Sequence, residues 1–238
     1  MMYNKLIMKK LYLLFFFLTG FSQFSPLFSE VATDPFVIPS TPPDTVITAE
    51  RMLIQSSTVI LETNVRAVQG IRVLICGRAF ARQNPEWLLA SGCPRVYQKE
   101  PVEGKKMMRE TTLDALNISW DASKKMLSAS PSVVFKTEER SWDLGTFTEG
   151  IVRSDNLEAF PDEKTLHFLG NVSMKGQEYT GSGEKLDYDK KNSEVILSGK
   201  NAMVEKEEFD LKERRMVKKK LTGEKIIYNT ETKFVQSE

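Results

Sequence analysis

Apolar and polar residues alternate along most of this chain with a period of two, which is the pattern of a β-strand buried on one face. In the stretch from 183 to 189, Gly-Glu-Lys-Leu-Asp-Tyr-Asp, Leu186 and Tyr188 share one face and charged residues occupy the other. A short polar run follows, after which Val195 and Leu197 return to the apolar face. The unit predicts a β-hairpin that is apolar on one side and charged on the other.

The same hairpin unit recurs along the chain. Residues 223–229, Gly-Glu-Lys-Ile-Ile-Tyr-Asn, repeat its first arm, and residues 166–170 repeat its second. Eroded copies of both arms occur at 50–61 and 116–129, and residues 87–92 form one more second arm. A chain built from one hairpin about six times over predicts a meander or repeat architecture. A single hairpin cannot bury its apolar face alone, so stacked neighbours must share the burial.

Aligning the copies assigns one continuous apolar face, which is the candidate functional surface. Met and aromatic residues are frequent on it, and the flexible Met side chain adapts to irregular apolar ligands. An ordinary sandwich core, filled by its own side chains, is the alternative. The candidate ligand-binding residues in the best-preserved copies are Leu166, Phe168, Val172, Met174, Leu186, Tyr188, Val195, Leu197, Met203, Ile226 and Tyr228.

The Glu-Lys-Leu-x-Tyr-Asp arm, the polar turn and the Val-x-Leu-x-Gly arm resemble the repeats of the OstA-like, or LptA, family of periplasmic lipopolysaccharide-transport proteins. The likeness is best over Asn156–Glu238 and eroded between Thr48 and Leu127. It implies an all-β fold, an OstA-like open β-jellyroll built from repeated antiparallel hairpins over residues 46–238.

The resemblance also implies partners. The interior would bind the acyl chains of lipid A, so that the residues of the apolar face form an acyl-chain groove. Sheet edges would pair with other components of the export machinery, and copies would associate head to tail as a bridge between inner and outer membranes. We expect the unpaired edges near 46–54 and 225–235, where the first and last strands have no neighbour in the sequence.

The N-terminal residues are typical of a targeting segment. Three lysines in the first ten residues precede a short apolar run, Leu11 to Leu18, which predicts a signal peptide over residues 1–29 and delivery to the periplasm. A retained transmembrane anchor is the alternative, although it needs about 20 apolar residues. An anchor would favour a membrane-bound adaptor that resembles the related LptC proteins. Residues 30–45 hold four prolines and predict an extended linker.

Composition and residue types argue against several function classes. Lys and Arg number 33 against 32 Asp and Glu, whereas a nucleic-acid partner favours a strongly basic face. His167 is the only histidine, and two cysteines cannot make a four-cysteine zinc site. We therefore expect no enzyme, no metal and no cofactor. A structural β domain with a closed core that binds no lipid remains an alternative to the transport protein.

The two cysteines, Cys76 and Cys93, are equidistant from the centre of Asn84-Pro85. If the chain turns there, the two thiols face one another across a hairpin, and an oxidising compartment would allow a disulfide. Two free thiols are the alternative, because an oblique register would separate the sulfur atoms.

Two charged segments interrupt the apolar alternation. Lys99 to Thr111 is rich in Lys, Arg and Glu, and it predicts a polar loop or a long crossover. Lys136 to Gly145 predicts a second polar linker between strands.

Overall fold

The computed structural model describes residues 45–83, 85–102, 107–141, 147–177, 179–210, 214–229, 232 and 235–238. The predicted signal peptide and all but the last residue of the predicted linker therefore lie outside the described residues. Within the described part the chain forms strands and no helix, so no helix there could cross a membrane. The strands are β1 (Thr45–Thr48), β2 (Arg51–Gln55), β3 (Thr58–Gln69), β4 (Arg72–Gln83), β5 (Glu86–Ser91), β6 (Arg95–Pro101), β7 (Met107–Asp114), β8 (Asn117–Asp121), β9 (Met126–Ser130), β10 (Val133–Ser141), β11 (Phe147–Ser154), β12 (Asn156–Phe160), β13 (Thr165–Lys175), β14 (Tyr179–Asp189), β15 (Glu194–Asp210), β16 (Arg215–Asn229) and β17 (Val235–Ser237).

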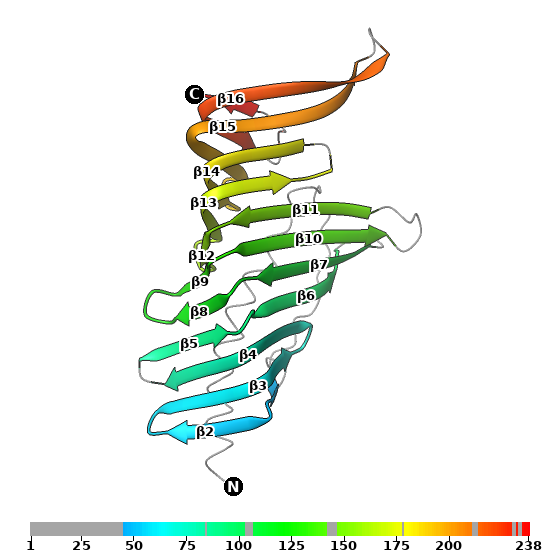
Figure 1. Ribbon diagram of the computed structural model, residues 1–238. Helices are drawn as coiled ribbons and strands as arrows, with labels where there is room; N and C mark the ends of the chain where they lie inside the picture. Colours follow the sequence, from blue (N-terminus) through cyan, green and yellow to red (C-terminus); the bar gives the residue numbers. More distant parts are fainter. Residues whose placement is uncertain are drawn as a thin grey trace.

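The strands form an antiparallel meander that follows the order of the chain. Each arm of the meander is one long strand or two shorter strands in line, and it pairs with the arms before and after it. For example, β6 pairs with β7 while β5, in line with β6, pairs with β8. Figure 1 shows the arms stacked from β2 at one end to β16 at the other. The predicted all-β architecture of repeated antiparallel hairpins is confirmed.

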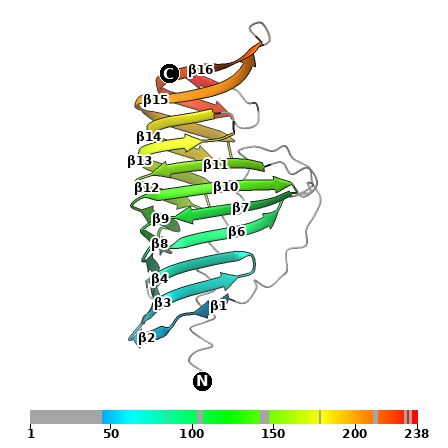
Figure 2. The same ribbon diagram turned by 45° about the vertical axis from the view of Figure 1, so that its right-hand side comes forward.

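Every arm bends near its middle, so the meander is folded lengthwise into two limbs. In the long strands the bend coincides with a shift in pairing register, as between Glu62 and Val65 in β3 and between Ser198 and Ala202 in β15. Such irregularities are β-bulges, which turn a strand and change its twist. Figures 1 and 2 show β15 and β16 curling around one side of the stack at this point.

The two limbs are defined by what each arm contributes on either side of its bend. The first limb holds β2, residues 58–62, 78–83, β5, β8, β9, β12, and residues 165–169, 185–189, 194–198 and 225–229, with β17 at its end. The second limb holds β1, residues 65–69, 72–76, β6, β7, β10, β11, and residues 172–175, 179–183, 202–210 and 215–223.

Gly199 illustrates why the chain bends where it does. Its φ is +135°, a conformation that residues with a Cβ atom rarely adopt. A Cβ atom on Gly199 would lie 2.8 Å from the backbone N of Glu184 in the adjacent strand. Thr63 and Asn64 bend β3 with φ values of 62° and 53°.

The Asp that ends a repeat arm closes the turn after it. Asp189 Oδ1 accepts hydrogen bonds from the backbone N–H groups of Lys191 and Asn192, at 2.8 and 3.2 Å. Asp121 accepts two equivalent bonds in its own turn, and Asn229 takes the same place in the last copy. Such side-chain caps explain why Tyr188-Asp189 and Trp120-Asp121 each precede a polar run.

Both charged segments that predicted loops are largely strands. β6 continues to Pro101, β7 starts at Met107 and β10 runs to Ser141, with only residues 103–106 and 142–146 outside the described part. The loop prediction was wrong because polar residues there replace apolar ones on the inward-facing positions without disturbing the alternation.

The predicted disulfide between Cys76 and Cys93 is not formed, and both thiols are free. The predicted register is correct in the hairpin itself, where Arg78 is opposite Ser91. The ladder ends there, however, and Gly92 and Cys93 have φ values of 75° and 56°. This bend leaves Cys93 exposed while Cys76 is buried in the interior, so the two sulfur atoms do not face one another.

Candidate functional site

The inner face of the first limb is an uninterrupted apolar surface. Residues directly opposite one another on neighbouring strands point to the same side of a sheet, so successive partners form a row across the limb. Two such rows, the first-limb ladders, cross it from end to end. One ladder is Met52, Leu61, Ala79, Ala90, Ile118, Ala129, Leu157, Phe168, Leu186, Leu197 and Ile226; the other is Ile54, Val59, Ala81, Leu88, Trp120, Leu127, Ala159, Leu166, Tyr188, Val195, Tyr228 and Val235.

The second limb carries a single equivalent row, next to the bend. All of its members are apolar, so three apolar ladders in total run the length of the molecule. This second-limb ladder is Ile47, Ala67, Leu74, Val96, Leu113, Phe135, Val152, Met174, Gly181, Val204 and Leu221.

The ladders of the two limbs face each other and share one hydrophobic core. Phe135 in the second limb and Phe168 in the first place their ring centroids 5.8 Å apart, edge to face at 62°. Both rings are almost completely buried. In the middle of the stack the interior is therefore occupied by the protein's own side chains.

The interior becomes exposed at both ends of the stack. At the first edge Met52 and Ile54 are 54% and 51% exposed, although each is opposite a buried residue of β3. At the last edge Val235 is 44% exposed and Leu221 is half-buried. The apolar surface thus continues to each end and stops there without a cover among the described residues.

Ten of the eleven predicted ligand-binding residues lie on this interior. Leu166, Phe168, Leu186, Tyr188, Val195, Leu197, Ile226 and Tyr228 belong to the first-limb ladders, Met174 to the second-limb ladder, and Val172 is buried beside the bend.

Met203 is the exception, and its assignment was wrong. The bulge between Ser198 and Ala202 shifts the alternation of β15, so that Ala202 and Val204 face the interior. Met203 then falls on the outer face. That the ten inward-facing residues bind acyl chains stays a prediction.

Edge pairing also differs in part from the prediction. The first edge is formed by β1 and β2, which pair only with β3 in the described part of the chain. At the other end β17 covers Ile226–Tyr228, and the backbone of Glu238 bonds Glu224 and Lys225. In the described part of the chain, the unpaired backbone at the last edge is therefore the second-limb part of β16, residues 215–222, rather than its first-limb part.

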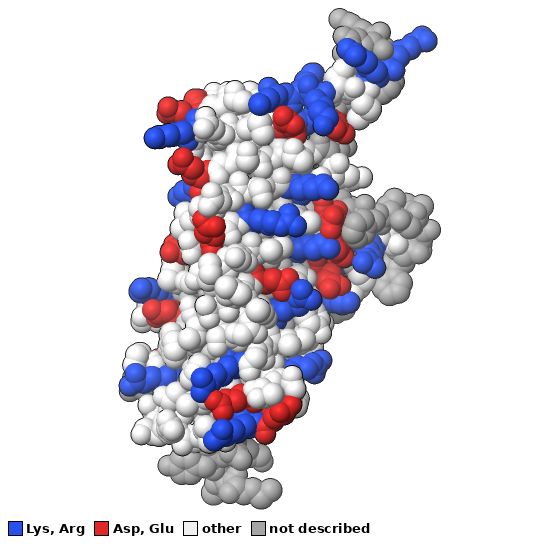
Figure 3. Space-filling view, in the orientation of Figure 1, with Lys and Arg blue, Asp and Glu red and all other residues white. Residues whose placement is uncertain are grey.

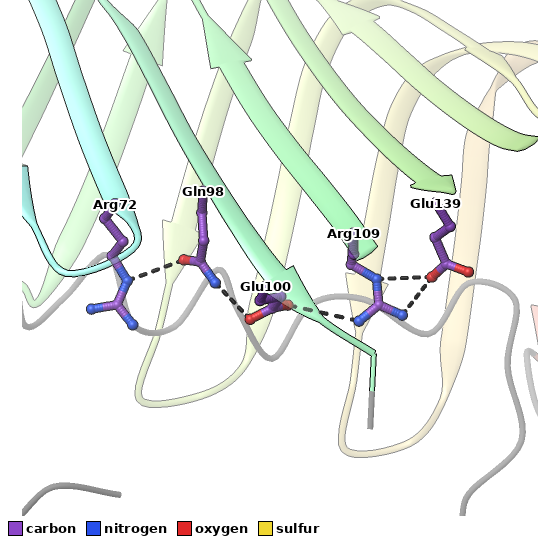
Figure 4. A network of polar contacts seen from close by, with 5 residues as sticks. All are labelled: Arg72, Gln98, Glu100, Arg109 and Glu139. Atoms are coloured by element: carbon purple, nitrogen blue, oxygen red, sulfur yellow. Dashed lines mark hydrogen bonds and ion pairs between the residues drawn. The ribbon is translucent and has the colours of Figure 1, made fainter. Parts of the chain in front are cut away.

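Beyond the apolar ladder, the inner face of the second limb becomes polar towards its free rim. We call this the polar strip: Gln69, Arg72, Gln98, Glu100, Arg109 and Glu139, contributed by β3, β4, β6, β7 and β10. Figure 4 shows five of these side chains forming a row at the strand ends.

Hydrogen bonds connect the polar strip across four strands. Arg72 Nε donates to Gln98 Oε1 at 3.0 Å, and Gln98 Nε2 donates to Glu100 Oε2 at 2.7 Å. Arg109 Nη1 forms an ion pair with Glu100 at 3.7 Å. Its Nε and Nη2 donate to one oxygen of Glu139, at 2.8 and 2.5 Å.

Burial perturbs the ionisable groups of this strip. Desolvation raises the pKa of Glu100, against the opposing effects of Arg109, Gln98 and Arg72. Desolvation likewise lowers the pKa of Arg72. Lys190, in a turn of the first limb, has its pKa lowered by burial and by Lys164 and Arg109. The rim of the first limb therefore lies close enough to the polar strip for its charges to interact.

Sequence reasoning missed the polar strip in part because Glu100, Arg109 and Glu139 fall in the two charged segments that predicted loops. The signal was the alternation itself. Gln98 and Glu100 continue the period of Val96, Thr111 and Arg109 continue that of Leu113, and Thr137 and Glu139 continue that of Phe135. Charged residues on an inward-facing position are uncommon and indicate a built polar feature.

The outer faces carry ordinary surface chemistry. Figure 3 shows Lys, Arg, Asp and Glu interspersed over the visible face, and Lys99 pairs with Glu110 at 2.9 Å across strands. His167 points outwards, with Nδ1 2.5 Å from Asp187 Oδ1. No cluster of three or more potential metal ligands occurs among the described residues.

The fold and the interior define an all-β jellyroll with a continuous apolar lining, and the strand edge at each end has no complete partner among the described residues. The chain belongs to the family of LptA and the LptD N-terminal domain, lipopolysaccharide transport proteins, whose family model matches residues 47–234. The resemblance predicted from the repeats is thereby confirmed.

Among solved structures, the chain is similar to the crystal structure of LptH, the LptA-homologous periplasmic component of the lipopolysaccharide transport device of Pseudomonas aeruginosa. The identity is 10%, the TM-score is 0.31, and the match covers 82% of each chain. No curated protein matches the chain.

Proposed function

We propose that this protein carries lipopolysaccharide through the periplasm, holding the acyl chains of lipid A against the three apolar ladders. The observation that carries the proposal is the continuity of those ladders, which run from the first edge to the last and end in exposed apolar side chains. An apolar surface that reaches both ends of a stack suits an extended apolar ligand passed along its length. Membership of the transport family supports the same role.

Acyl chains would enter where the interior is exposed, at the ends of the stack. In its middle the limbs contact one another, so entry there would require them to separate. Leu221 lies at the last end, half-buried on the second-limb ladder, and the neighbouring Thr222 points to the outer face. This pair of residues allows the same substitution to be placed inside and outside.

The test is binding of a lipid A-type glycolipid to Leu221→Asp, with Thr222→Asp as the matched control. We expect Leu221→Asp to lose at least tenfold in affinity, because a carboxylate buried against acyl chains costs several kcal/mol. Thr222→Asp should bind like the wild type. Equal binding by all three proteins would contradict the proposed location of the acyl chains. Leu197→Asp, at the fully buried centre of a ladder, should abolish binding but would also destabilise the fold.

We propose further that copies, or other export-machinery components, assemble head to tail through the unpaired edges. Strand addition would satisfy the backbone groups of β1 and β2 at one end and of residues 215–222 at the other. It would also cover the exposed apolar side chains and join one interior to the next. A contact of this kind does not close on itself, so it gives rods whose length grows with concentration.

Light scattering over a concentration series tests this assembly. Ile54→Asp should hold the protein monomeric, because it places a charge at the joint between two interiors. Gln55→Asp is the control, since Gln55 is also exposed on the same strand but faces outwards. A wild-type chain that stays monomeric at every concentration, and that pairs with no partner's edge, would refute head-to-tail assembly.

Two alternatives retain a distinct test each. A membrane-anchored, LptC-like adaptor would keep its N-terminal segment, so mass spectrometry of the mature protein separates it from a cleaved periplasmic carrier. A closed structural domain is favoured by the Phe135–Phe168 contact, and it would bind no lipid at either end.

A further inference from the structure

The interior of this protein is amphipathic across its width. The first limb is apolar throughout its inner face, whereas the second limb changes from the apolar ladder to the polar strip over two residues. In β6, for example, Val96 belongs to the ladder and Gln98 to the strip. Two residues of a strand span roughly 7 Å. A molecule with acyl chains along the ladder would therefore place its headgroup beside the polar strip.

Within this strip Arg109 and Arg72 differ in how far they are paired. Arg109 engages Glu139 through two nitrogens and Glu100 through the third. Arg72 bonds Gln98 through Nε alone, and no described residue accepts a hydrogen bond from its two Nη atoms. Figure 4 draws no interaction from these two nitrogens to the other labelled residues of the row.

A second, independent observation lies next to Arg72. Gln69 is directly opposite it in the β3–β4 ladder, so both side chains are on the same face. Gln69 is 2% exposed, yet neither the nitrogen nor the oxygen of its carboxamide has a hydrogen-bond partner among the described residues. Buried amides almost always find a partner, so an unpaired one beside a guanidinium with two unused nitrogens indicates a place for a ligand.

We propose that Arg72 and Gln69 form a binding site for the phosphate group of the glycolipid whose acyl chains occupy the apolar ladders. The planar guanidinium matches two phosphate oxygens through its Nη atoms, and the Gln69 amide donates to the same group. Gln98 is a positioning residue, because its oxygen holds Arg72 Nε while its nitrogen is held by Glu100. Lys190, which interacts electrostatically with Arg109 and Glu100, adds positive charge near the strip. This inference rests on the proposed function.

The competing role for the same residues is structural. The network joins β4, β6, β7 and β10 at their free ends, so it could serve only to hold the strands of this rim together. The two roles predict different effects of Arg72→Gln. Loss of a phosphate site weakens binding of a phosphorylated lipid alone, whereas loss of a structural contact weakens binding of any lipid and lowers stability.

The experiment measures binding of two lipid A-type glycolipids to the full chain by titration calorimetry. One ligand carries its phosphates and the other has the same acyl chains with the phosphates removed. The proteins are the wild type, Arg72→Gln and Arg153→Gln, the last being a matched control on the outer face of the same limb. Urea unfolding of each variant reports whether the fold is retained.

We expect the wild type to prefer the phosphorylated ligand by about tenfold, which corresponds to about 1.4 kcal/mol. Arg72→Gln should bind both ligands equally, and Arg153→Gln should keep the preference. No preference in the wild type, or an equal loss for both ligands in Arg72→Gln, would overturn the phosphate site while leaving lipid transport intact. Failure of the wild type to bind either ligand would instead refute the proposed function.

Inorganic phosphate distinguishes a lipid headgroup from a free anion. At millimolar concentration it should weaken binding of the phosphorylated lipid and leave that of the dephosphorylated lipid unchanged. If phosphate binds the wild type through Arg72 yet displaces no lipid, the site takes free phosphate and the headgroup assignment is wrong.

Discussion

Contact between the two limbs can be measured with a double-mutant cycle on Phe135 and Phe168. These rings lie on opposite limbs, 5.8 Å apart between centroids and at an edge-to-face angle of 62°. Phe168 is 2% and Phe135 6% exposed. The cycle consists of Phe135→Ala, Phe168→Ala and the double variant, each compared with the wild type by urea unfolding.

The structure sets the expected magnitudes. Replacing a buried Phe by Ala costs about 3–5 kcal/mol, from lost burial and the cavity that remains. An edge-to-face pair contributes about 0.5–1.5 kcal/mol beyond burial. The double variant should therefore lose less than the sum of the single losses, by about the pair contribution, because the sum counts the shared contact twice.

Additivity elsewhere provides the control. Phe168→Ala combined with Val59→Ala, which lies towards the other end of the stack, should give losses that add within about 0.5 kcal/mol. A coupling near zero between Phe135 and Phe168 would refute the contact and mean that the limbs stand apart in solution. The slope of the unfolding curve must stay constant across the variants, since a repeat architecture can lose two-state behaviour.

Three further predictions concern the strip, the bend and the thiols. Arg109→Met should lower the free energy of unfolding by about 3–5 kcal/mol at pH 7, because it leaves buried carboxylates unpaired. Burial already raises the pKa of Glu100, so this loss should shrink at pH 5 as Glu100 protonates. An equal loss at both pH values in urea unfolding would argue against the buried ion pairs. Gly199→Ala should destabilise the fold by about 1–3 kcal/mol through its φ of +135°, and an unchanged melting temperature would exclude strain at the bend. Iodoacetamide at pH 8 should label the exposed Cys93 and spare Cys76, because burial raises the pKa of the Cys76 thiol to about 11. Detection of a disulfide between the two cysteines by mass spectrometry of the native protein would contradict this prediction.

Local alternation determined most of the fold before any tertiary contact was considered. A hydrophobic period of two residues indicates which side chains share a face, and the Asp-capped polar runs indicate where the chain turns back. Leu186, Tyr188, Val195 and Leu197 were assigned to the interior on that basis, and all four are buried there. Because the hairpins follow one another without crossovers, their order in space is also their order in the sequence.

The lengthwise bend was decided only by the tertiary structure. A bulge changes the face of every residue after it, so one irregularity in β15 moved Met203 outwards and brought Val204 in. The same kind of bend separated Cys76 from Cys93 despite a correct hairpin register. Whether a strand bulges depends on the position of its neighbours, which alternation within one strand does not encode.

The polar strip shows the same division between local pattern and tertiary context. Charged residues in a strand read as surface or loop when each segment is considered alone. Folding places Arg109 and Glu139 next to each other on the inner face. Each neutralises the other, which lowers the free-energy cost of burying the two charges. Only the pairing of β7 with β10 could reveal that these two charges interact, because Arg109 and Glu139 lie 30 residues apart in the sequence.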